Sequence, residues 1–312
     1  SDGVFLVVDA TQSGLRLDKA VALLMPDHSR ARLQQWIVAG HVRVNDDVCT
    51  RVRQVVSAGD HIHVQVQVSP QAQAFEPQDI DFEVIEESEH WLVVNKRAGL
   101  VVHPGAGNWQ GTLLNGLLYR YPDLAHVARA GIVHRLDKDT TGLMVVARTD
   151  VAQTHLVRQL QARTVKRQYL ALAHGRLESA GLVVDRPIGR DPRVPVRMSV
   201  NPQGVGKPAV TEVKRLATGL LEGQPVSQIQ CQLQTGRTHQ IRVHLSSLGH
   251  PLVGDTLYGG QPLAGVARQM LHAAHLAFVD PGTGQAVAFD CDMPPDMKWV
   301  WLALSADEKA PS

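Results

Sequence analysis

A short segment with little regularity divides the chain and limits how it can fold. Residues 69–79 contain two prolines and three glutamines and show no clear helical or strand periodicity. A stretch of this kind does not continue a regular element and is typical of a linker. The full length of 312 residues also exceeds that of most single compact domains. We therefore predict a small N-terminal domain over 1–68, a linker over 69–79 and a larger domain over 80–312.

The composition is that of an ordinary globular protein. Hydrophobic residues make up 44% of the chain and charged residues 20%, which argues against global disorder. Three cysteines, far apart, argue against a disulfide framework and a cysteine zinc site. No apolar run approaches the ~18 residues that a membrane span needs, and no basic-then-apolar leader is visible. We expect a soluble cytoplasmic protein without membrane association, and a monomer.

The charge is nearly balanced in total but unevenly distributed. The formal net charge is +1, yet the segment 76–90 holds seven acidic residues and no Lys or Arg. Two later segments are basic: 129–169 has eight Lys and Arg against three acids, and 186–215 has seven against two. These segments either form solvated faces or converge in space on a surface for nucleic acid, and the sequence leaves both interpretations open.

The N-terminal domain has the pattern of two short helices against a small sheet. Apolar residues at helical spacing predict a helix over 17–24, and Ser29 is a candidate N-cap of a second helix that Gly40 ends. Alternating apolar residues predict strands at 42–44 and 62–68. The arginines of this unit are Arg16, Arg30, Arg32, Arg43, Arg51 and Arg53.

Residues 15–65 resemble the S4 RNA-binding domain. One departure is Asp46-Asp47, where a glycine is usual in the turn, but Asp also adopts turn geometry. The alternative is a generic small α/β module whose arginines only aid solubility. The matching segments are Arg16–Asp18, Ser29–Arg32, Ile37–Asn45 and Gly59–Asp60. The resemblance implies RNA binding, with Arg16, Arg30, Arg32 and Arg43 as the contacting residues.

The larger domain contains more strands than helices, and the two do not alternate regularly. This order favours an α+β fold with a mainly antiparallel, mixed sheet over a doubly wound α/β fold. Asp150, the first residue of the helix predicted over 150–163, is a possible N-cap. Strands are predicted over 90–96, 143–147, 168–173, 210–216 and 226–233, and helices over 111–121 and 150–163.

Residues 131–143 place a carboxylate in a setting suited to chemistry. Asp137 lies between Arg135 and Lys138, and two threonines and a glycine follow before an apolar strand. A capped surface turn with salt bridges would have the same composition. Asp139 lies close by, so the segment alone does not decide which carboxylate is chemical.

Two further segments carry candidate site residues. Tyr169 lies in the strand-like segment 166–172, where its place in the apolar alternation would also suit a core residue. Arg237 lies in 234–245 at a predicted strand-to-helix junction, with Thr238 at the start of the helix. Such a junction is a suitable place from which a guanidinium can reach a carboxylate.

Together these three segments resemble the RluA/RsuA group of pseudouridine synthases. The signature is matched at His134-Arg135-Leu136-Asp137 and Thr141-Gly142-Leu143, and the resemblance runs from Gly14 to about Pro295. Arg97 departs from the pattern, since Pro often follows the Lys there. Further matches are Asn95-Lys96, Gly99–Pro104, Gly111–Leu113, Gly249–Asp255 and Leu271–Ala273.

The resemblance implies an isomerisation of uridine within RNA. The C1′–N1 bond breaks, the uracil turns in the pocket, and C5 joins C1′, with no redox change and no cofactor. In this interpretation Asp137 is the essential carboxylate, acting as nucleophile or base on the ribose. Arg237 is its cationic partner, and Tyr169 stacks on the uracil.

A stacked uridine cannot present its ribose to a carboxylate, so the resemblance also implies base flipping. Arg135 would fill the vacated space, with His134 beside it. The S4 module and the segment 104–108 resemble those members of the group that act on a hairpin loop of large-subunit (23S) rRNA. The expected partner is thus 23S rRNA or an assembling large ribosomal subunit.

The sequence supports other functions less well. The pairs His239/His244 and His272/His275 lack the context of a metal site, and 105–107 lacks the third glycine of a dinucleotide loop. A catalytically silent RNA-binding or ribosome-assembly factor is a second hypothesis, and the presence of Asp137, Tyr169 and Arg237 together favours the enzyme over it. A glycosidase-like enzyme would need a second acid opposite Asp137, and only Asp139 is an obvious candidate.

Overall fold

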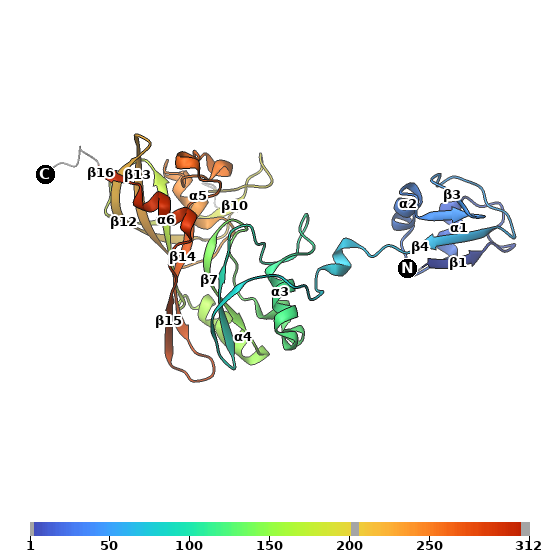
Figure 1. The fold of residues 1–312 in the computed structure, drawn as a ribbon, viewed down its shortest axis with the longest axis horizontal. Coiled ribbons are helices and arrows are strands. Elements are labelled where there is room, and N and C mark those ends of the chain that lie inside the picture. The colour runs from blue at the N-terminus through green and yellow to red at the C-terminus, as the bar shows by residue number, and fades with distance from the viewer. Residues whose placement is uncertain (1–2, 201–205, 307–312) are drawn as a thin grey trace. The chain divides into compact units, whose positions relative to one another are not determined.

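The computed structural model describes residues 3–200 and 206–306, and the chain divides into two compact units, 1–72 and 73–312. This division falls inside the segment whose composition predicts a linker. Figure 1 shows both units, and each has a hydrophobic core of its own. Within the described residues, no helix combines the length and apolar character needed to cross a membrane.

The first unit packs two helices on a four-stranded antiparallel sheet of order β1-β4-β2-β3. The predicted N-cap is present, since the Ser29 hydroxyl accepts a hydrogen bond from the backbone N–H of Arg32. The core lies between the layers and includes Leu17, Leu33 and Ile62. The elements are β1 (Gly3–Val7), α1 (Leu17–Leu24), α2 (Arg30–Val38), β2 (Val42–Val44), β3 (Asp47–Val48) and β4 (His61–Gln65).

The turn between β2 and β3 explains the departure from glycine. Asn45 and Asp46 have φ values of 51° and 69°, in the left-handed region. Asn and Asp tolerate this region better than other residues that carry a side chain. The Asn45 amide also accepts from the His61 backbone N–H and donates to Asp60, which fixes the turn against β4.

The second unit is built on a large mixed sheet. Its strands follow the order β16-β12-β13-β8-β14-β7-β6-β5, with β9 paired to β12 and β15 to β14. Every pairing is antiparallel except that between β14 and β7. The predicted α+β class is confirmed. The strands are β5 (Glu83–Glu87), β6 (Trp91–Lys96), β7 (Thr141–Ala147), β8 (Lys166–His174), β9 (Gly181–Asp185), β12 (Val210–Leu221), β13 (Gln224–Leu233), β14 (Leu271–Val279), β15 (Ala286–Asp290) and β16 (Ser305–Ala306), and a separate pair is β10 (Ile188–Arg190) with β11 (Met198–Val200).

Helices cover both faces of this sheet. All seven residues of β7 are buried, which explains their almost continuous apolar sequence. Met144 faces a core that includes α3 and α5, whereas Leu143 faces one that includes α4. The predicted cap of α4 is wrong by one residue, because the Thr149 hydroxyl accepts from the Ala152 N–H and Asp150 is the first helical residue. The helices are α3 (Leu113–Arg120), α4 (Asp150–Gln161), α5 (Gln240–Ser247) and α6 (Pro295–Leu302).

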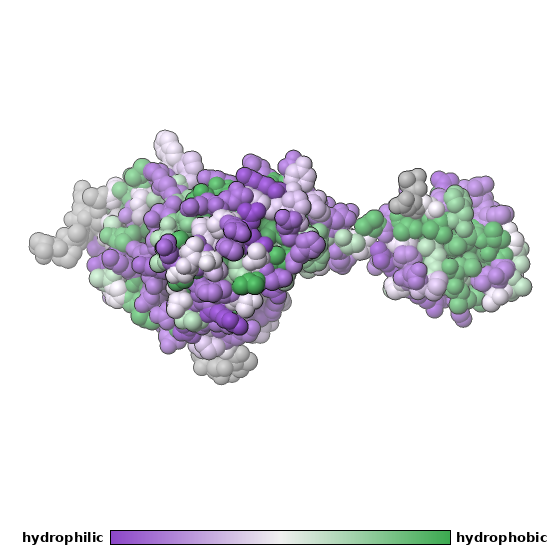
Figure 2. All heavy atoms as spheres, turned by 90° about the horizontal axis from the view of Figure 1, so that it is seen from below, coloured by the Kyte–Doolittle hydropathy of each residue, from purple (hydrophilic) through white to green (hydrophobic). Residues whose placement is uncertain are grey.

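Both units expose apolar side chains. The face in Figure 2 mixes hydrophilic and hydrophobic residues on both units, with hydrophilic colour dominant on the larger one. Exposed apolar side chains are scattered over different elements, for example Phe5 on β1, Val151 on α4 and Trp299 on α6. Scattered apolar side chains are ordinary for a folded domain.

Candidate active site

The segment with the His-Arg-Leu-Asp signature forms a loop that leads into β7. Gly142, at the start of β7, has a φ of 121° and lies against β14. A Cβ atom there would come within 2.2 Å of the Ala273 carbonyl oxygen. Only glycine therefore allows the two parallel strands to meet directly behind the loop.

Two buried cationic side chains, Lys96 and Arg268, donate hydrogen bonds to the backbone of this loop. The Lys96 ammonium is fully buried and donates to the carbonyl oxygens of Arg97, Leu100 and Lys138 at 2.8, 2.9 and 2.8 Å. Arg268 donates to the Asp139 carbonyl oxygen at 2.9 Å. The consecutive carbonyl groups of Lys138 and Asp139 are thus anchored, and the Asp137 side chain lines the cavity.

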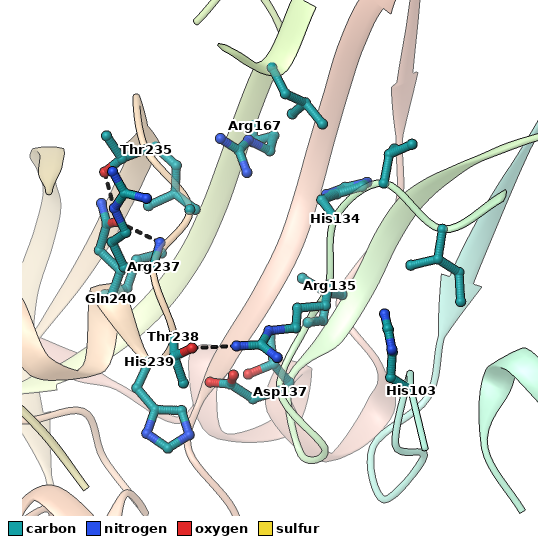
Figure 3. Close-up of a pocket in the computed structure, with 18 of the residues that line it drawn as sticks. His103, His134, Arg135, Asp137, Arg167, Thr235, Arg237, Thr238, His239 and Gln240 are labelled. Carbon is teal, nitrogen blue, oxygen red and sulfur yellow. Dashed lines mark hydrogen bonds between the residues drawn. The ribbon is translucent and has the colours of Figure 1, made fainter. Parts of the chain in front are cut away.

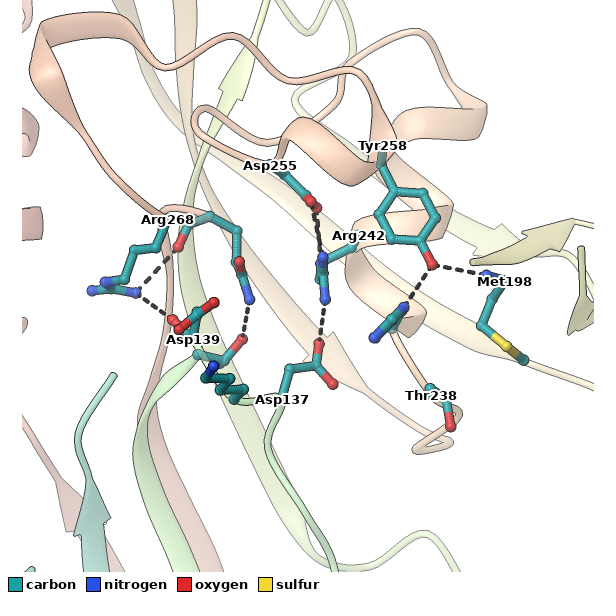
Figure 4. Close-up of polar contacts among 12 residues, drawn as sticks. Asp137, Asp139, Met198, Thr238, Arg242, Asp255, Tyr258 and Arg268 are labelled. Atoms are coloured by element: carbon teal, nitrogen blue, oxygen red, sulfur yellow. Dashed lines mark hydrogen bonds and ion pairs between the residues drawn. The ribbon is translucent and has the colours of Figure 1, made fainter. Parts of the chain in front are cut away.

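The Asp137 carboxylate meets an arginine that the sequence did not single out (Figure 4). Arg242 Nη1 lies 3.1 Å from Asp137 Oδ2, and the same guanidinium makes two hydrogen bonds of 2.9 Å to Asp255. Asp255 is only 1% exposed, against 22% for Asp137. The Arg242 guanidinium also lies over the Tyr258 ring, 5.1 Å from its centroid. The Asp255 carboxylate and the Tyr258 ring therefore fix the position of the Arg242 guanidinium.

The predicted pairing of Asp137 with Arg237 is wrong. Arg237 Nε donates to the Pro208 carbonyl oxygen at 2.9 Å, and its backbone N–H donates to the Gln240 side chain. The helix begins at Gln240 rather than at Thr238, so Arg237 precedes it, and Arg242 in the first turn faces the carboxylate. A signal was present: Arg242 stands among apolar residues of a buried helix, where a charged side chain requires a partner.

Tyr169 is both a core residue and part of the cavity wall. It lies on β8 opposite Cys231 and Ala273, with 5% of its surface exposed. Burial raises the pKa of its phenol to about 12, so the group is neutral at physiological pH. Tyr169 is therefore a core residue that also lines the cavity, so the two interpretations of its sequence position do not exclude each other.

His134 and Arg135 have different roles in the loop. His134 Nε2 accepts from the Val145 N–H at 3.0 Å, and burial lowers the pKa of this histidine to about 3. A neutral ring thus ties the loop to β7. Arg135 is exposed and donates to the Thr238 hydroxyl, which connects the loop to the segment before α5.

These side chains enclose a cavity of about 860 Å³ (Figure 3). The volume lies in the range of pockets that bury small organic ligands, ~300–1,000 Å³. Asp137 is the only carboxylate that lines it within the described residues. Its lining arginines are Arg129, Arg135, Arg163, Arg167, Arg237 and Arg242. Four of the eight basic residues of segment 129–169 thus line this cavity, whereas Arg190 and Arg197 of the second basic segment make local contacts.

Each of the two histidine pairs contains one histidine whose ring nitrogens both contact protein groups. His244 has one ring nitrogen on the Thr211 hydroxyl and the other on the Arg186 carbonyl. His272 is placed likewise between Thr141 and the Cys291 carbonyl. Within residues 3–200 and 206–306, no group of three or more His, Cys, Asp or Glu side chains could hold a metal ion.

The four arginines of the first unit that are predicted to contact RNA also make contacts within that unit. Arg16 and Arg30 both pair with the buried Asp18 at 3.0 Å. Burial raises the pKa of Asp18, but the hydrogen bonds from Gln34 and Arg30 and the charges of Arg30 and Arg16 together hold it below its ordinary value. Arg16 and Arg30 keep 39% and 48% of their side-chain surface exposed. The two remaining residues, Arg32 and Arg43, donate to the carbonyl oxygens of Gln67 and Asp46.

Comparison with known proteins identifies the class. The family model described as RNA pseudouridylate synthase matches residues 90–247, and that of the S4 domain matches residues 15–62. The chain belongs to the RNA pseudouridylate synthase family and carries an S4 domain ahead of the catalytic domain. It is an RNA pseudouridine synthase.

Similar proteins cover nearly the whole chain. "Ribosomal large subunit pseudouridine synthase D" of Vibrio parahaemolyticus is 47% identical over 96% of this chain and 94% of its own length. The protein of the same name from Escherichia coli K12 is 44% identical with the same coverage. That of Neisseria meningitidis serogroup B is 48% identical over 94% of this chain and 79% of its own length.

Solved structures show the same fold. "Human RNA Pseudouridylate Synthase Domain Containing 1" aligns with a TM-score of 0.56 at 30% identity, covering 75% of this chain and 89% of that one. The human domain-containing-4 protein has the same TM-score at 23% identity, covers 71% of this chain and 92% of that one, and shows the fold alone.

Proposed function

We propose that the protein converts specific uridines of large-subunit (23S) rRNA to pseudouridine, with Asp137 acting on the ribose of a flipped-out uridine. The observation that carries this proposal is the cavity with one carboxylate and six arginines. A site for a neutral sugar that uses paired acids would need a second carboxylate. Asp139 is not part of the described lining. The cations suit a substrate whose backbone is anionic.

Asp137 acts as nucleophile or base toward the ribose, and Arg242 orients it. The guanidinium contacts Asp137 through Nη1, while Nε and Nη2 are held by Asp255. Because Asp255 stays paired throughout, Arg242 keeps its place even when the charge on Asp137 changes during the reaction. Arg242 and Asp255 are therefore positioning residues for the carboxylate.

Tyr169 binds the uracil base, and residues at the cavity opening contact the neighbouring RNA. The neutral ring of Tyr169 offers a flat surface on which the uracil stacks while it turns. Arg135, exposed beside the opening, fills the space that the uridine leaves and contacts neighbouring bases or phosphate. Arg237 lines the same cavity and contacts the RNA rather than the carboxylate.

The identity of the RNA rests on the relatives named as large-subunit synthases. The S4 unit adds exposed arginines that strengthen binding through phosphate contacts. We propose that the protein acts in the cytoplasm as a monomer on 23S rRNA or on an assembling large subunit, and that this modification supports large-subunit maturation.

The experiment that tests this function has two parts. Purified protein is incubated with 23S rRNA transcripts and with assembling large subunits, and pseudouridine is mapped by sequencing with chemical detection. The same mapping in a deletion strain identifies the natural positions. Pseudouridine at defined 23S positions that disappears in the deletion strain supports the proposal. An unchanged modification pattern, together with no product in vitro, would refute it.

A further inference from the structure

Arg167 is a buried cation on the cavity wall with no partner in the described protein. It lies on β8, two residues before Tyr169, so both side chains project from the same face of the strand. Only 8% of its surface is exposed, and its Nε is buried without a hydrogen bond. Among the described residues no carboxylate forms an ion pair with it. Burial lowers the pKa of the Arg167 guanidinium, and Tyr169 beside it is neutral.

The other buried arginines of this unit are compensated. Arg242 has Asp137 and Asp255, and Arg268 has Asp296. Burial of an unpaired charge is unfavourable, and a guanidinium stays protonated in proteins. Because residues 3–200 and 206–306 provide no anion for Arg167, the substrate is the remaining source of the compensating charge.

The surroundings favour the base over the phosphates as the source of that charge. The exposed arginines of the cavity, Arg129, Arg135 and Arg163, are available to backbone phosphates. Arg167 instead lies beside the neutral His134 and Tyr169, and in the view of Figure 3 it is at the far end of the drawn residues from Asp137. A uridine whose ribose is at Asp137 and whose ring lies on Tyr169 directs its base toward this region.

We propose that Arg167 binds the carbonyl edge of the uracil and stabilises the negative charge that the ring carries after it leaves the ribose. This inference rests on the proposed function. When the C1′–N1 bond breaks, its electron pair leaves with the uracil and spreads over N1, O2 and O4, while the Asp137 carboxylate compensates C1′. The ring then turns, C5 bonds to C1′, the C5 proton is lost and N1 gains a proton. The sum is an isomerisation that needs no oxidant or reductant.

The test compares two leaving groups in RNA of the same sequence. One carries uridine at the target position, and the other carries 5-fluorouridine, whose ring accepts negative charge more readily. Single-turnover rates with saturating enzyme are read as loss of the target nucleoside from nuclease digests. For Arg167→Met we expect a loss of about 10²–10³-fold with uridine and at least several-fold less with 5-fluorouridine. Arg167→Lys should retain part of the uridine rate.

A second variant displaces the guanidinium without removing it. A Cβ atom on Gly236 would lie 2.8 Å from Arg167 Nη1, and Gly236 does not have a positive φ. Gly236→Ala should therefore also slow the uridine substrate selectively. Lys166→Met, on the opposite and exposed face of β8, is the matched control and should keep the wild-type rate.

The outcomes separate the alternatives. Equal slowing of both substrates by Arg167→Met and Gly236→Ala would overturn the proposal in favour of a structural role. Weaker RNA binding with a smaller salt dependence, at an unchanged saturated rate, would overturn it in favour of a phosphate contact. Failure of the proposed function appears differently, as absence of product with the wild-type enzyme, and this would remove the Arg167 proposal as well.

Discussion

Asp137 and Arg242 are 105 residues apart in the sequence, and their side chains meet at 3.1 Å inside the cavity. The pairing joins the loop before β7 to helix α5, and Asp255 holds the same guanidinium from the other side. The geometry of the carboxylate therefore depends on the packing of segments that are remote in sequence.

Arg242 and Arg237 should differ sharply when each is changed. Arg242→Lys removes the planar guanidinium that contacts both Asp137 and Asp255. The Asp137 carboxylate then shifts, so we expect the single-turnover rate to fall by about 10²-fold. Arg237→Met should weaken RNA binding and leave the saturated rate within about fivefold of wild type, since its Nε bonds only to Pro208. A larger rate loss for Arg237→Met than for Arg242→Lys would contradict the corrected pairing.

Asp255 should affect the rate without affecting substrate affinity. It is not among the residues that line the cavity, and within the described part of the chain its carboxylate accepts hydrogen bonds from Arg242 alone. Asp255→Asn keeps the shape but weakens two charge-assisted hydrogen bonds. We expect kcat to fall at least ~10-fold with KM unchanged. A raised KM at constant kcat would show that Asp255 acts on RNA binding instead.

Lys96 should stabilise the catalytic unit through the loop. Lys96→Met leaves three carbonyl oxygens without their donor, and we expect a loss of about 3 kcal/mol in the free energy of unfolding. Lys138→Met, an exposed lysine of the same loop, is the control and should cost less than ~0.5 kcal/mol. Urea unfolding of the two variants measures the difference, and equal stabilities would contradict the anchoring role.

The contribution of Lys96 should also depend on pH. Burial lowers its pKa from 10.5 to about 7, although Asp139 and Asp137 oppose this. Between pH 7 and 10.5 the unfolded chain holds a proton that the folded chain has released, so stability rises with pH. The difference between wild type and Lys96→Met should therefore grow above pH 7, by at most about 1.4 kcal/mol per pH unit. A constant difference would mean that the three carbonyls keep Lys96 charged.

The S4 unit should contribute binding rather than chemistry. Removal of residues 1–72, which form a separate compact unit, should weaken RNA binding and lower its salt dependence. The saturated single-turnover rate should stay within about threefold of the full chain. Equal losses in affinity and in saturated rate would argue against a tethered binding module.

Local sequence patterns predicted the parts of this protein that depend on local interactions. Strand β7, helix α2 with its cap, and the loop around Asp137 follow from periodicity and short motifs. The partner of Asp137 did not follow, because it depends on where α5 begins and on a contact between distant segments. The parallel pairing of β14 with β7 and the anchoring by Lys96 and Arg268 were also missed, since neither leaves a local pattern.

Release of tritium from C5-labelled rRNA is the most direct assay of the proposed isomerisation. The new bond between C5 and C1′ displaces the C5 hydrogen, so the wild-type protein should release label from 23S rRNA in proportion to the pseudouridine formed. Asp137→Asn should abolish release while RNA affinity stays within about threefold of wild type. Release by Asp137→Asn at the wild-type rate, or no release by the wild-type protein from any rRNA, would contradict the account.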